Sequence, residues 1–295
     1  MKKRIFYLPD TLCILAIAIF VLLDTFVITR TYGTVEAKST ENIQTVSHTN
    51  RNETVITDDT YQDDNISINI ETYRYNDTTI YVADVQLSSI DYLYSAFANN
   101  AYGKNITAKT STIAEDNNAI LAINGDYYGA RNSGFVVRNG TIYRTSVSSA
   151  SQEDLVVNSD GSFSIITEGS TDITSLDALQ VYSFGPALIV NGEISVDTND
   201  EVGKAKASNP RTAICEIEPL HYLFVVSDGR TTESKGLSLY EFAQFLTQFN
   251  VKTAYNLDGG GSSTMVFNGN LVNNPTTSGN SIKERSISDV ICIGY

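Results

Sequence analysis

The sequence is poor in the residues that build common catalytic and metal sites. Its 295 residues include two histidines, three cysteines and no tryptophan. No histidine cluster and no Cys-x-x-Cys pair occurs, which excludes histidine-rich and cysteine-rich zinc sites. A Ser-His-Asp relay would have to use His221, whose place at the start of the apolar run 222–226 is more typical of a strand end. Cys215 and Cys292 lie in separate apolar runs, and the sequence leaves open whether they pair or are two buried thiols.

Positive charge is also scarce. Lysine and arginine number 20 against 34 aspartates and glutamates, so the formal net charge is −14. Binding of phosphate backbones needs basic stripes, and their absence excludes nucleic acid as a partner. One or two arginines can still bind a small anionic substrate locally.

The N-terminus has the pattern of an export signal. Three basic residues at positions 2–4 precede an apolar stretch over residues 8–28, which places the N-terminus inside and the rest outside. A run of this length can span a membrane. We therefore expect a signal-anchor over residues 1–33, membrane contact through residues 8–28, and a domain outside the cytoplasm. The small residues before Lys38 leave cleavage near Ala37, and secretion, as the alternative.

The remaining chain divides into a polar segment and one domain. Residues 34–65 are rich in Thr, Asn, Ser, Asp and Glu without apolar periodicity, which predicts a polar linker. From residue 66 onward, short alternating apolar runs punctuated by Asn-Gly and Asp-Gly predict many strands. Ser238 and Glu241 form a capping box before a helix ending at Asn250, and shorter helices are expected over 93–100 and 174–179. Together these patterns predict a single α+β domain, residues 66–295, with mixed β-sheets and a few helices.

The stretch Asn256 to Met265, reading NLDGGGSSTM, is the strongest sign of a functional site. Three consecutive glycines are costly in regular structure, but their backbone can approach a ligand closely and present N–H groups to an anion. The stretch lacks the Gly-Lys-Ser/Thr of a nucleotide phosphate loop, and it lacks the Gly-x-Ser-x-Gly of a nucleophile elbow. We therefore expect a rigid glycine-rich binding loop of another kind.

Three aspartates share one context, since Asp126, Asp228 and Asp258 each follow an apolar strand and adjoin glycine. Carboxylates at strand ends can be held rigidly at the mouth of a cleft, so we expect them to share a site. Arg211 and Arg285 each stand at the start of an expected strand. Oxygen-only clusters also suit calcium or magnesium, and the sequence leaves a divalent cation possible without requiring one.

Taken together and in this order, NGDYY, FGPALIVNG, NPRTA, SDGR, NLDGGGSSTM and ERSISDV resemble the phosphodiester glycosidase family. The resemblance covers roughly residues 80–295, and its Asp-Gly-Gly-Gly-Ser-Ser element is the most specific part. It implies hydrolysis of a sugar 1-phosphodiester at the anomeric carbon, in a cell-surface or exported glycan such as an exopolysaccharide. The cysteine-rich and additional domains of the animal member are missing here, so its glycoprotein substrate is not implied.

The residues fit that chemistry. A phosphodiester leaves a sugar readily, so stabilisation of the departing phosphate matters more than a general acid. The expected catalytic residues are Asp126, Asp258 and Arg211, with the aspartates' roles as base and nucleophile unassigned. The expected substrate-binding residues are Asn124, Asp228, Gly259, Gly260, Gly261, Ser262, Ser263 and Arg285. Two alternatives stay open, a metal-dependent phosphodiesterase or phosphatase and a non-catalytic module that binds wall glycan.

Overall fold

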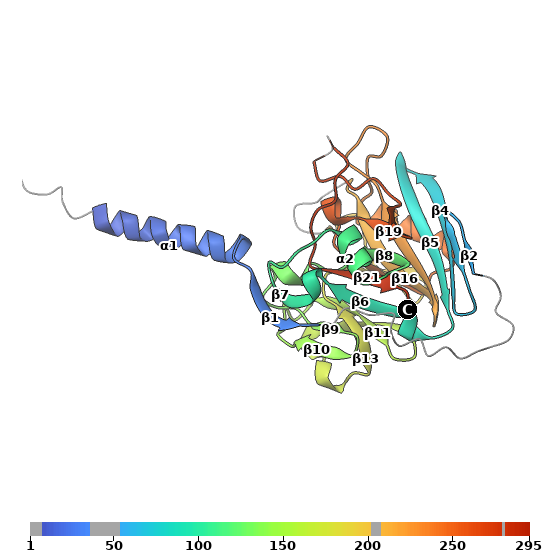
Figure 1. The fold of residues 1–295 in the computed structure, drawn as a ribbon, viewed down its shortest axis with the longest axis horizontal. Coiled ribbons are helices and arrows are strands. Elements are labelled where there is room, and N and C mark those ends of the chain that lie inside the picture. Colours follow the sequence, from blue (N-terminus) through green and yellow to red (C-terminus); the bar gives the residue numbers. More distant parts are fainter. Residues whose placement is uncertain (1–7, 36–53, 202–207, 279–280) are drawn as a thin grey trace, which may run out of the picture.

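The computed structural model describes residues 8–35, 54–201, 208–278 and 281–295. Strands dominate a body built from one nine-stranded and two five-stranded sheets, and a helix projects away from it (Figure 1). The α-helices are α1 (Leu8–Phe26), α2 (Thr110–Asp116) and α3 (Leu239–Leu246). Short 3₁₀ turns are η2 (Ile90–Tyr92), η3 (Ala98–Asn100), η4 (Tyr128–Ala130), η5 (Glu168–Ser170), η6 (Ile173–Ser175), η7 (Thr247–Phe249) and η8 (Gly260–Ser262).

The nine-stranded sheet carries most of the elements that surround the glycine-rich loop. Its strands, in spatial order, are β15 (Glu193–Ile194), β14 (Ala187–Val190), β18 (Thr253–Asn256), β16 (Arg211–Glu218), β17 (His221–Ser227), β5 (Thr78–Leu87), β4 (Ile66–Tyr75), β3 (Thr60–Gln62) and β2 (Val55–Ile56). Each pairing among these described strands is antiparallel, including that of β18, which follows α3 and lies between β14 and β16. Strands β17 and β18 both run antiparallel to β16, so they are parallel to each other and α3 connects them across β16. Because every hydrogen-bonded pair in the sheet is still antiparallel, the expected α+β class is confirmed.

Two five-stranded sheets and one strand pair complete the fold. The first is ordered β20 (Asn270–Leu271), β19 (Met265–Phe267), β8 (Leu121–Asn124), β21 (Asp289–Ile293) and β6 (Leu93–Phe97). The second is ordered β10 (Thr141–Arg144), β9 (Val136–Arg138), β13 (Ala178–Tyr182), β11 (Glu153–Asn158) and β12 (Phe163–Thr167). The strand pair is β1 (Arg30–Thr34) with β7 (Ala101–Lys104).

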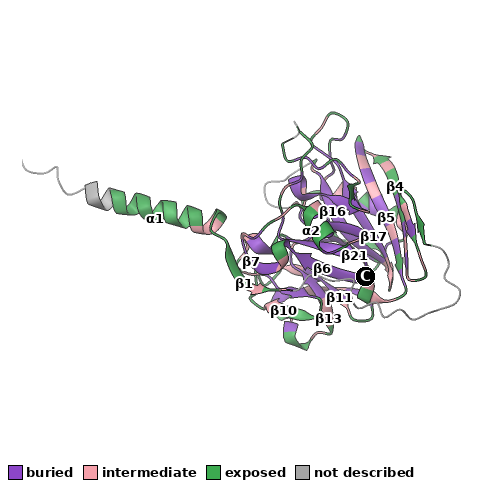
Figure 2. Ribbon diagram, viewed as in Figure 1, coloured by how far each residue is buried: buried purple, intermediate pink, exposed green. Residues whose placement is uncertain are grey.

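Apolar residues at alternate positions of the strands pack the sheets and helices together in layers. Inward residues of β4 and β5 pack with those of β8, β19 and β21 in one continuous core, which joins the nine-stranded sheet to the first five-stranded sheet. The opposite face of the nine-stranded sheet packs under α3, through Phe242 and Leu246 among others. Helix α2 packs through Ile113 and Ala114 on the outer face of the five-stranded sheet. Figure 2 shows the resulting buried interior across the central strands.

The helix predicted from the capping box is confirmed. The Ser238 hydroxyl accepts from the Glu241 backbone amide, and the Glu241 carboxylate accepts from the Ser238 backbone amide. The helix passes through η7 and ends at Asn250 in the left-handed conformation, with φ 56°. By contrast, the short helix expected over 93–100 is wrong, because 93–97 forms β6. All five of its residues are buried, so no alternation of buried and exposed positions distinguishes the strand from a helix. The short helix expected over 174–179 is likewise replaced by η6 and the start of β13.

The segment before the domain is partly described. Helix α1 leads into β1, which pairs with β7, and Nδ2 of the Asn105 side chain donates to the carbonyl oxygens of Thr25 and Ile28 at 3.3 and 3.0 Å. Among the helices of the described residues, none combines the length and hydropathy that crossing a membrane requires. Strand β3 pairs with β4, and β2 pairs with β3, so the sheet takes in residues within the 34–65 range assigned to a linker. The basic start at 2–4 and the cleavage point expected near Ala37 lie outside the described residues.

Candidate active site

Strands of two sheets end together around the glycine-rich loop. In the nine-stranded sheet, β16 begins beside the ends of β17 and β18 because it is antiparallel to both. The Asp258 amide, just after β18, donates to the carbonyl oxygen of Gly125, just after β8. The strands that precede Asp126, Asp228 and Asp258 therefore end close together, at the same end of the two sheets.

Close approach of other side chains explains the glycines. Gly260 has φ 62°, and a Cβ there would lie 2.7 Å from Nη2 of Arg230. A Cβ on Gly261 would lie 2.5 Å from Oγ1 of Thr277. Position 260 needs glycine because of its positive φ, and position 261 needs it because Thr277 packs against the loop there.

Part of the loop's hydrogen-bonding capacity is used internally. The Gly260 amide donates to the Pro210 carbonyl oxygen at 2.8 Å, and the Ser262 amide donates to the Gly259 carbonyl oxygen at 3.2 Å. Ser263 is fully buried, and its carbonyl oxygen accepts from the Asn273 side chain. Two of the amides expected to stabilise phosphate are thus engaged in holding the loop, which leaves side chains as the main charged groups here.

Asp258, Ser262 and Arg285 form what we call the open cluster. The Ser262 hydroxyl donates to Oδ2 of Asp258 at 2.5 Å, and Nη2 of Arg285 approaches the same oxygen at 3.0 Å. Nε of Arg285 also donates to the Ser262 hydroxyl at 2.8 Å. The Arg285 side chain is 40% exposed and that of Asp258 is 12% exposed, so the cluster can meet a ligand.

The surroundings make Asp258 more basic than an exposed aspartate. Burial raises the pKa of Asp258, and the Arg285 charge and the Ser262 hydrogen bond counteract part of that effect. A desolvated carboxylate with one oxygen fixed by two donors suits a base or a nucleophile.

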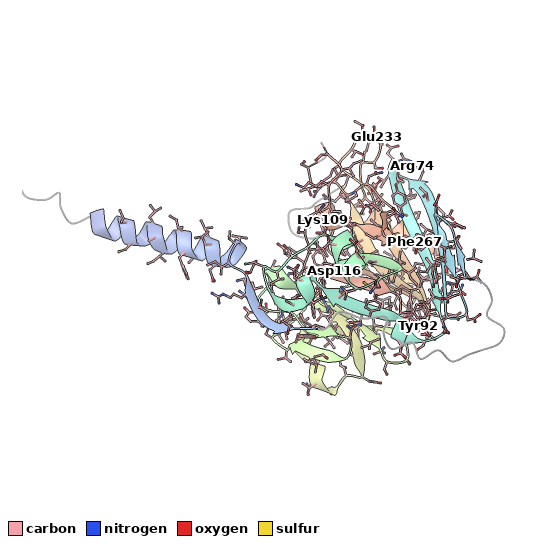
Figure 3. All side chains as sticks on the ribbon, in the orientation of Figure 1. Arg74, Tyr92, Lys109, Asp116, Glu233 and Phe267 are labelled. Carbon is pink, nitrogen blue, oxygen red and sulfur yellow. The ribbon has the colours of Figure 1, made fainter. Side chains whose placement is uncertain are left out.

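A second arginine, Arg230, flanks the loop from the other side. Its Nε and Nη2 donate to Oδ1 of Asn209 at 3.2 and 3.0 Å, and its backbone is left-handed with φ 63°. Burial lowers the pKa of Arg230 and the positive charge of Arg285 lowers it further, so the two cations lie within electrostatic reach. The Arg230 loop is tied to β4, where Arg74 donates to the Glu233 carbonyl oxygen at 2.8 Å; both residues are labelled in Figure 3.

Arg230 is the functional candidate that sequence reasoning missed. The available signal was its place in Ser-Asp-Gly-Arg, where it follows Asp228 by two residues at the end of β17. Asp228 itself is buried and accepts from the Asn274 amide at 2.9 Å and from the Asn273 side chain at 3.2 Å. The Tyr81 hydroxyl also approaches Asp228, at 3.4 Å. Asp228 therefore organises the 272–274 segment beside the loop.

The Arg211 side chain lies on the other face of the sheet. Its backbone adjoins the loop, but its Nε donates to the Leu237 carbonyl oxygen at 2.8 Å and its Nη2 pairs with Glu201 at 2.7 Å. Side chains alternate across a strand, so Thr212 turns towards Asn124 while Arg211 turns towards α3. The structure does not bring the Arg211 guanidinium to the open cluster.

Asn124 and Asp126 lie beneath the loop. The Asn124 amide nitrogen donates to the Asp258 carbonyl oxygen at 2.6 Å, and its Oδ1 accepts from the Thr212 hydroxyl and the Thr264 amide at 2.9 and 3.2 Å. Asn124 is fully buried, so it fixes the loop to both sheets.

Asp126 belongs instead to what we call the sealed triad, Asp126, Arg138 and Asp289. Nη2 of Arg138 lies 2.9 Å from Asp126 Oδ1 and 2.8 Å from Asp289 Oδ2, and each of the three side chains is at most 1% exposed. Asp126 also accepts from the amides of Tyr128 and Ser183 at 3.1 and 2.9 Å. A substrate cannot reach Asp126 while this triad is packed.

The metal question was left open by the sequence. In the parts of the chain that the structure describes, no group of three or more His, Cys, Asp or Glu side chains is arranged to hold a metal ion. Cys215 and Cys292 are both buried, and no disulfide joins them.

Comparison with known proteins places the chain in a family. Residues 117–294 match the phosphodiester glycosidase family. The N-acetylglucosamine-1-phosphodiester alpha-N-acetylglucosaminidases of Mus musculus and Homo sapiens are 36% and 35% identical to this chain over 121 residues, which is 36% of this chain and 23% of theirs. The chain thus spans about a quarter of the length of these relatives. The SPbeta prophage-derived uncharacterized protein YomE of Bacillus subtilis is 24% identical over 91% of this chain and 42% of its own.

The fold is also shared. The catalytic domain of the zebrafish N-acetylglucosamine-1-phosphodiester alpha-N-acetylglucosaminidase, auto-inhibited by its pro-peptide, superposes with a TM-score of 0.62 at 23% identity, covering 78% of this chain and 83% of that one. A hypothetical protein from Synechocystis superposes with a TM-score of 0.53 at 16% identity, covering 78% and 62%. The family match includes the open cluster, the sealed triad and Arg230. The chain therefore belongs to the phosphodiester glycosidase family.

Proposed function

We propose that this protein hydrolyses a sugar 1-phosphodiester at the anomeric carbon, with N-acetylglucosamine as the first sugar to test. The family supports the reaction class, and the names of the animal relatives support the sugar. The observation that carries the proposal is the open cluster, where the Asp258 carboxylate lies beside an exposed arginine, with Arg230 across the loop.

The reaction requires little acid catalysis. The bond between C1 and the phosphate oxygen breaks, the phosphate takes the electron pair, and water supplies the hydroxyl that C1 gains. Because a phosphate monoester anion is a good leaving group, the chain needs positive charge where it departs. Arg285 and Arg230 supply that charge, in the role that the sequence analysis gave to Arg211.

Asp258 supplies the carboxylate. Its fixed Oδ2 and raised pKa suit either attack on C1 or removal of a proton from water. Attack on C1 gives net retention of anomeric configuration and activation of water gives inversion, so proton NMR of the first sugar released assigns the role. Asp126 then acts as a positioning residue beneath Gly125.

The decisive experiment uses N-acetylglucosamine 1-(methyl phosphodiester) in water enriched in oxygen-18. Label in the sugar supports C–O cleavage. Label in the phosphate identifies the alternative, a phosphodiesterase, and loss of that activity with chelator would make it metal-dependent. Unchanged glycan binding without turnover would identify a binding module. The methyl glycoside of the same sugar is the control, since it lacks the phosphate and should not be cleaved.

We also propose that the domain acts on a cell-surface or exported glycan, outside the cytoplasm and held at the cell membrane by residues 8–28. Support comes from the basic start, the apolar stretch and the polar segment that follows it. Cell fractionation with N-terminal sequencing is the test. A mature chain beginning near Lys38 and free in the medium would reject the anchor but not the export.

A further inference from the structure

A groove of about 1030 Å³ lies between the β4–β5 part of the nine-stranded sheet and the β19–β20 hairpin. One wall is formed by Phe267, labelled in Figure 3, and the hairpin residues that follow it. The other wall includes Thr72 and Tyr81, which face each other across the β4–β5 pair. None of these residues belongs to the open cluster.

The pattern on β4 shows why the groove is open. Ile66, Ile68 and Ile70 point into the core, and alternation places Thr72 on the same face. Thr72 is exposed, so the inner face of the sheet changes from apolar to polar where the five-stranded sheet stops covering it. If the core covered this part of β4 as well, an apolar residue would be expected at position 72.

One end of the groove reaches the active site. The Tyr81 hydroxyl lies 3.4 Å from Asp228 Oδ2, and Val272, on the opposite wall, precedes the asparagines that bind the same carboxylate. Asp228 lies two residues before Arg230, which packs on Gly260. The groove therefore approaches the loop from the Arg230 side. A group attached to the phosphate would extend from the scissile bond in this direction.

The lining selects for uncharged, amphipathic ligands. The charged residues among the described residues that line it are Asp58, Asp59 and Glu71, with no lysine or arginine among them, so this lining would repel a polyanion. Tyr81 and the exposed Leu271 offer apolar surface for the C–H faces of a sugar ring, and the carboxylates and amides accept and donate to hydroxyls.

Resting on the proposed function, we propose that this groove binds the leaving group of the substrate, an uncharged oligosaccharide attached through the phosphate. The sugar to be released would lie at Asp258, the phosphate between Arg285 and Arg230, and the oligosaccharide along β4–β5 towards the β19–β20 hairpin.

The test compares two substrates, N-acetylglucosamine 1-phosphate esterified to methanol or to a primary hydroxyl of a neutral trisaccharide. We expect kcat/KM to be about tenfold higher for the trisaccharide ester, about 1.4 kcal/mol. Thr72→Arg, which places a long side chain in the groove, should remove this advantage and leave the methyl ester unchanged. Asn69→Arg is the matched control, because Asn69 is exposed on the opposite face of the same strand.

A binding measurement keeps the groove testable if neither ester is hydrolysed. Chitotetraose, titrated by NMR, should shift signals of residues 70–72 and 267–272 in wild type and in Asn69→Arg, but not in Thr72→Arg. Equal kcat/KM for the two esters, chitotetraose binding that Thr72→Arg does not weaken, or no chitotetraose binding at millimolar concentration would each overturn the proposal. Hydrolysis of the methyl ester alone would retain the proposed function without the groove.

Discussion

The open cluster and the sealed triad are built from the same groups, yet they differ in access to solvent. Each combines arginine with aspartate, and both contact the turn after β8. Gly125 joins them, since its carbonyl oxygen accepts from the Asp258 amide and its own amide donates to the Asp289 carbonyl oxygen. The Arg285 side chain is 40% exposed, whereas that of Arg138 is 1% exposed.

This difference separates charge that binds a ligand from charge that holds the fold. In the sealed triad, the N–H groups of Arg138 contact Asp126, Asp289 and two carbonyl oxygens, so none faces solvent. The open arginine keeps part of its surface in water, and a phosphate can approach it without first breaking the core. The sequence alone does not distinguish the aspartates of the open cluster from those of the sealed triad.

The largest effect should follow from Asp258→Asn. The change keeps the shape but removes the charge, so we expect kcat/KM to fall about 10³-fold, or about 4 kcal/mol, with the protein still folded. Asp116→Asn, on the exposed end of α2 (Figure 3), is the matched control and should be neutral. An Asp258→Asn variant that keeps more than about a tenth of wild-type kcat/KM would show that another group supplies the carboxylate.

Arg138→Met tests the sealed side of the comparison. Two buried carboxylates would lose their cation, so we expect the free energy of unfolding to fall by about 3 to 5 kcal/mol in urea denaturation. Arg285→Met, the same change in the open cluster, should cost less than about 1 kcal/mol of stability because the arginine is partly solvated. Equal losses in the two variants would contradict the distinction between the clusters.

Arg285→Lys should weaken catalysis by about 100-fold, or about 2.7 kcal/mol, because a point charge cannot reproduce a bidentate contact with two phosphate oxygens. The methyl phosphodiester of N-acetylglucosamine 1-phosphate is the substrate. Arg211→Lys provides the control, since the Arg211 side chain binds Leu237 and Glu201 away from the cluster. If a folded Arg211→Lys variant lost activity and Arg285→Lys did not, phosphate recognition would return to Arg211.

The smallest effect concerns pH and a neighbour of the triad, Asp154. Burial and the nearby charge of Glu168 raise the pKa of Asp154 from 3.8 to about 9. The folded state therefore keeps this proton where the unfolded state releases it, and the stability contributed by the group is complete below about 3.8 and lost as pH rises towards about 9. Asp154→Asn should raise the free energy of unfolding at pH 8 and leave it unchanged at pH 3.5, because the amide carries no charge at either pH. An unaltered dependence of stability on pH would show that Asp154 is ionised in the folded protein.

Local signals predicted well where one element decides the outcome. The capping box fixed the start of α3, and Asp-Gly-Gly-Gly-Ser-Ser located the loop and Asp258. Asp126 follows Gly125, whose carbonyl oxygen accepts from the Asp258 amide, but the sequence could not tell which way the Asp126 side chain turns. That direction depends on Arg138 and Asp289, which come from β9 and β21 and meet Asp126 only in the folded protein. Arg211 shows the same limit, because one residue of strand register moves a side chain to the other face.

Strand β21 has a consequence for how the protein is made. It lies between β6 and β8, so the sheet begun by residues 93–124 cannot close until residues 289–293 leave the ribosome. Until then the edges of β6 and β8 that β21 will join leave backbone N–H and C=O groups unpaired, and Asp126 and Arg138 lack Asp289. Pairing across such long sequence separations is slow, and a nascent chain in this condition is prone to aggregate. Synthesis rate and chaperone supply, rather than the final stability of the fold, should limit the yield of active protein.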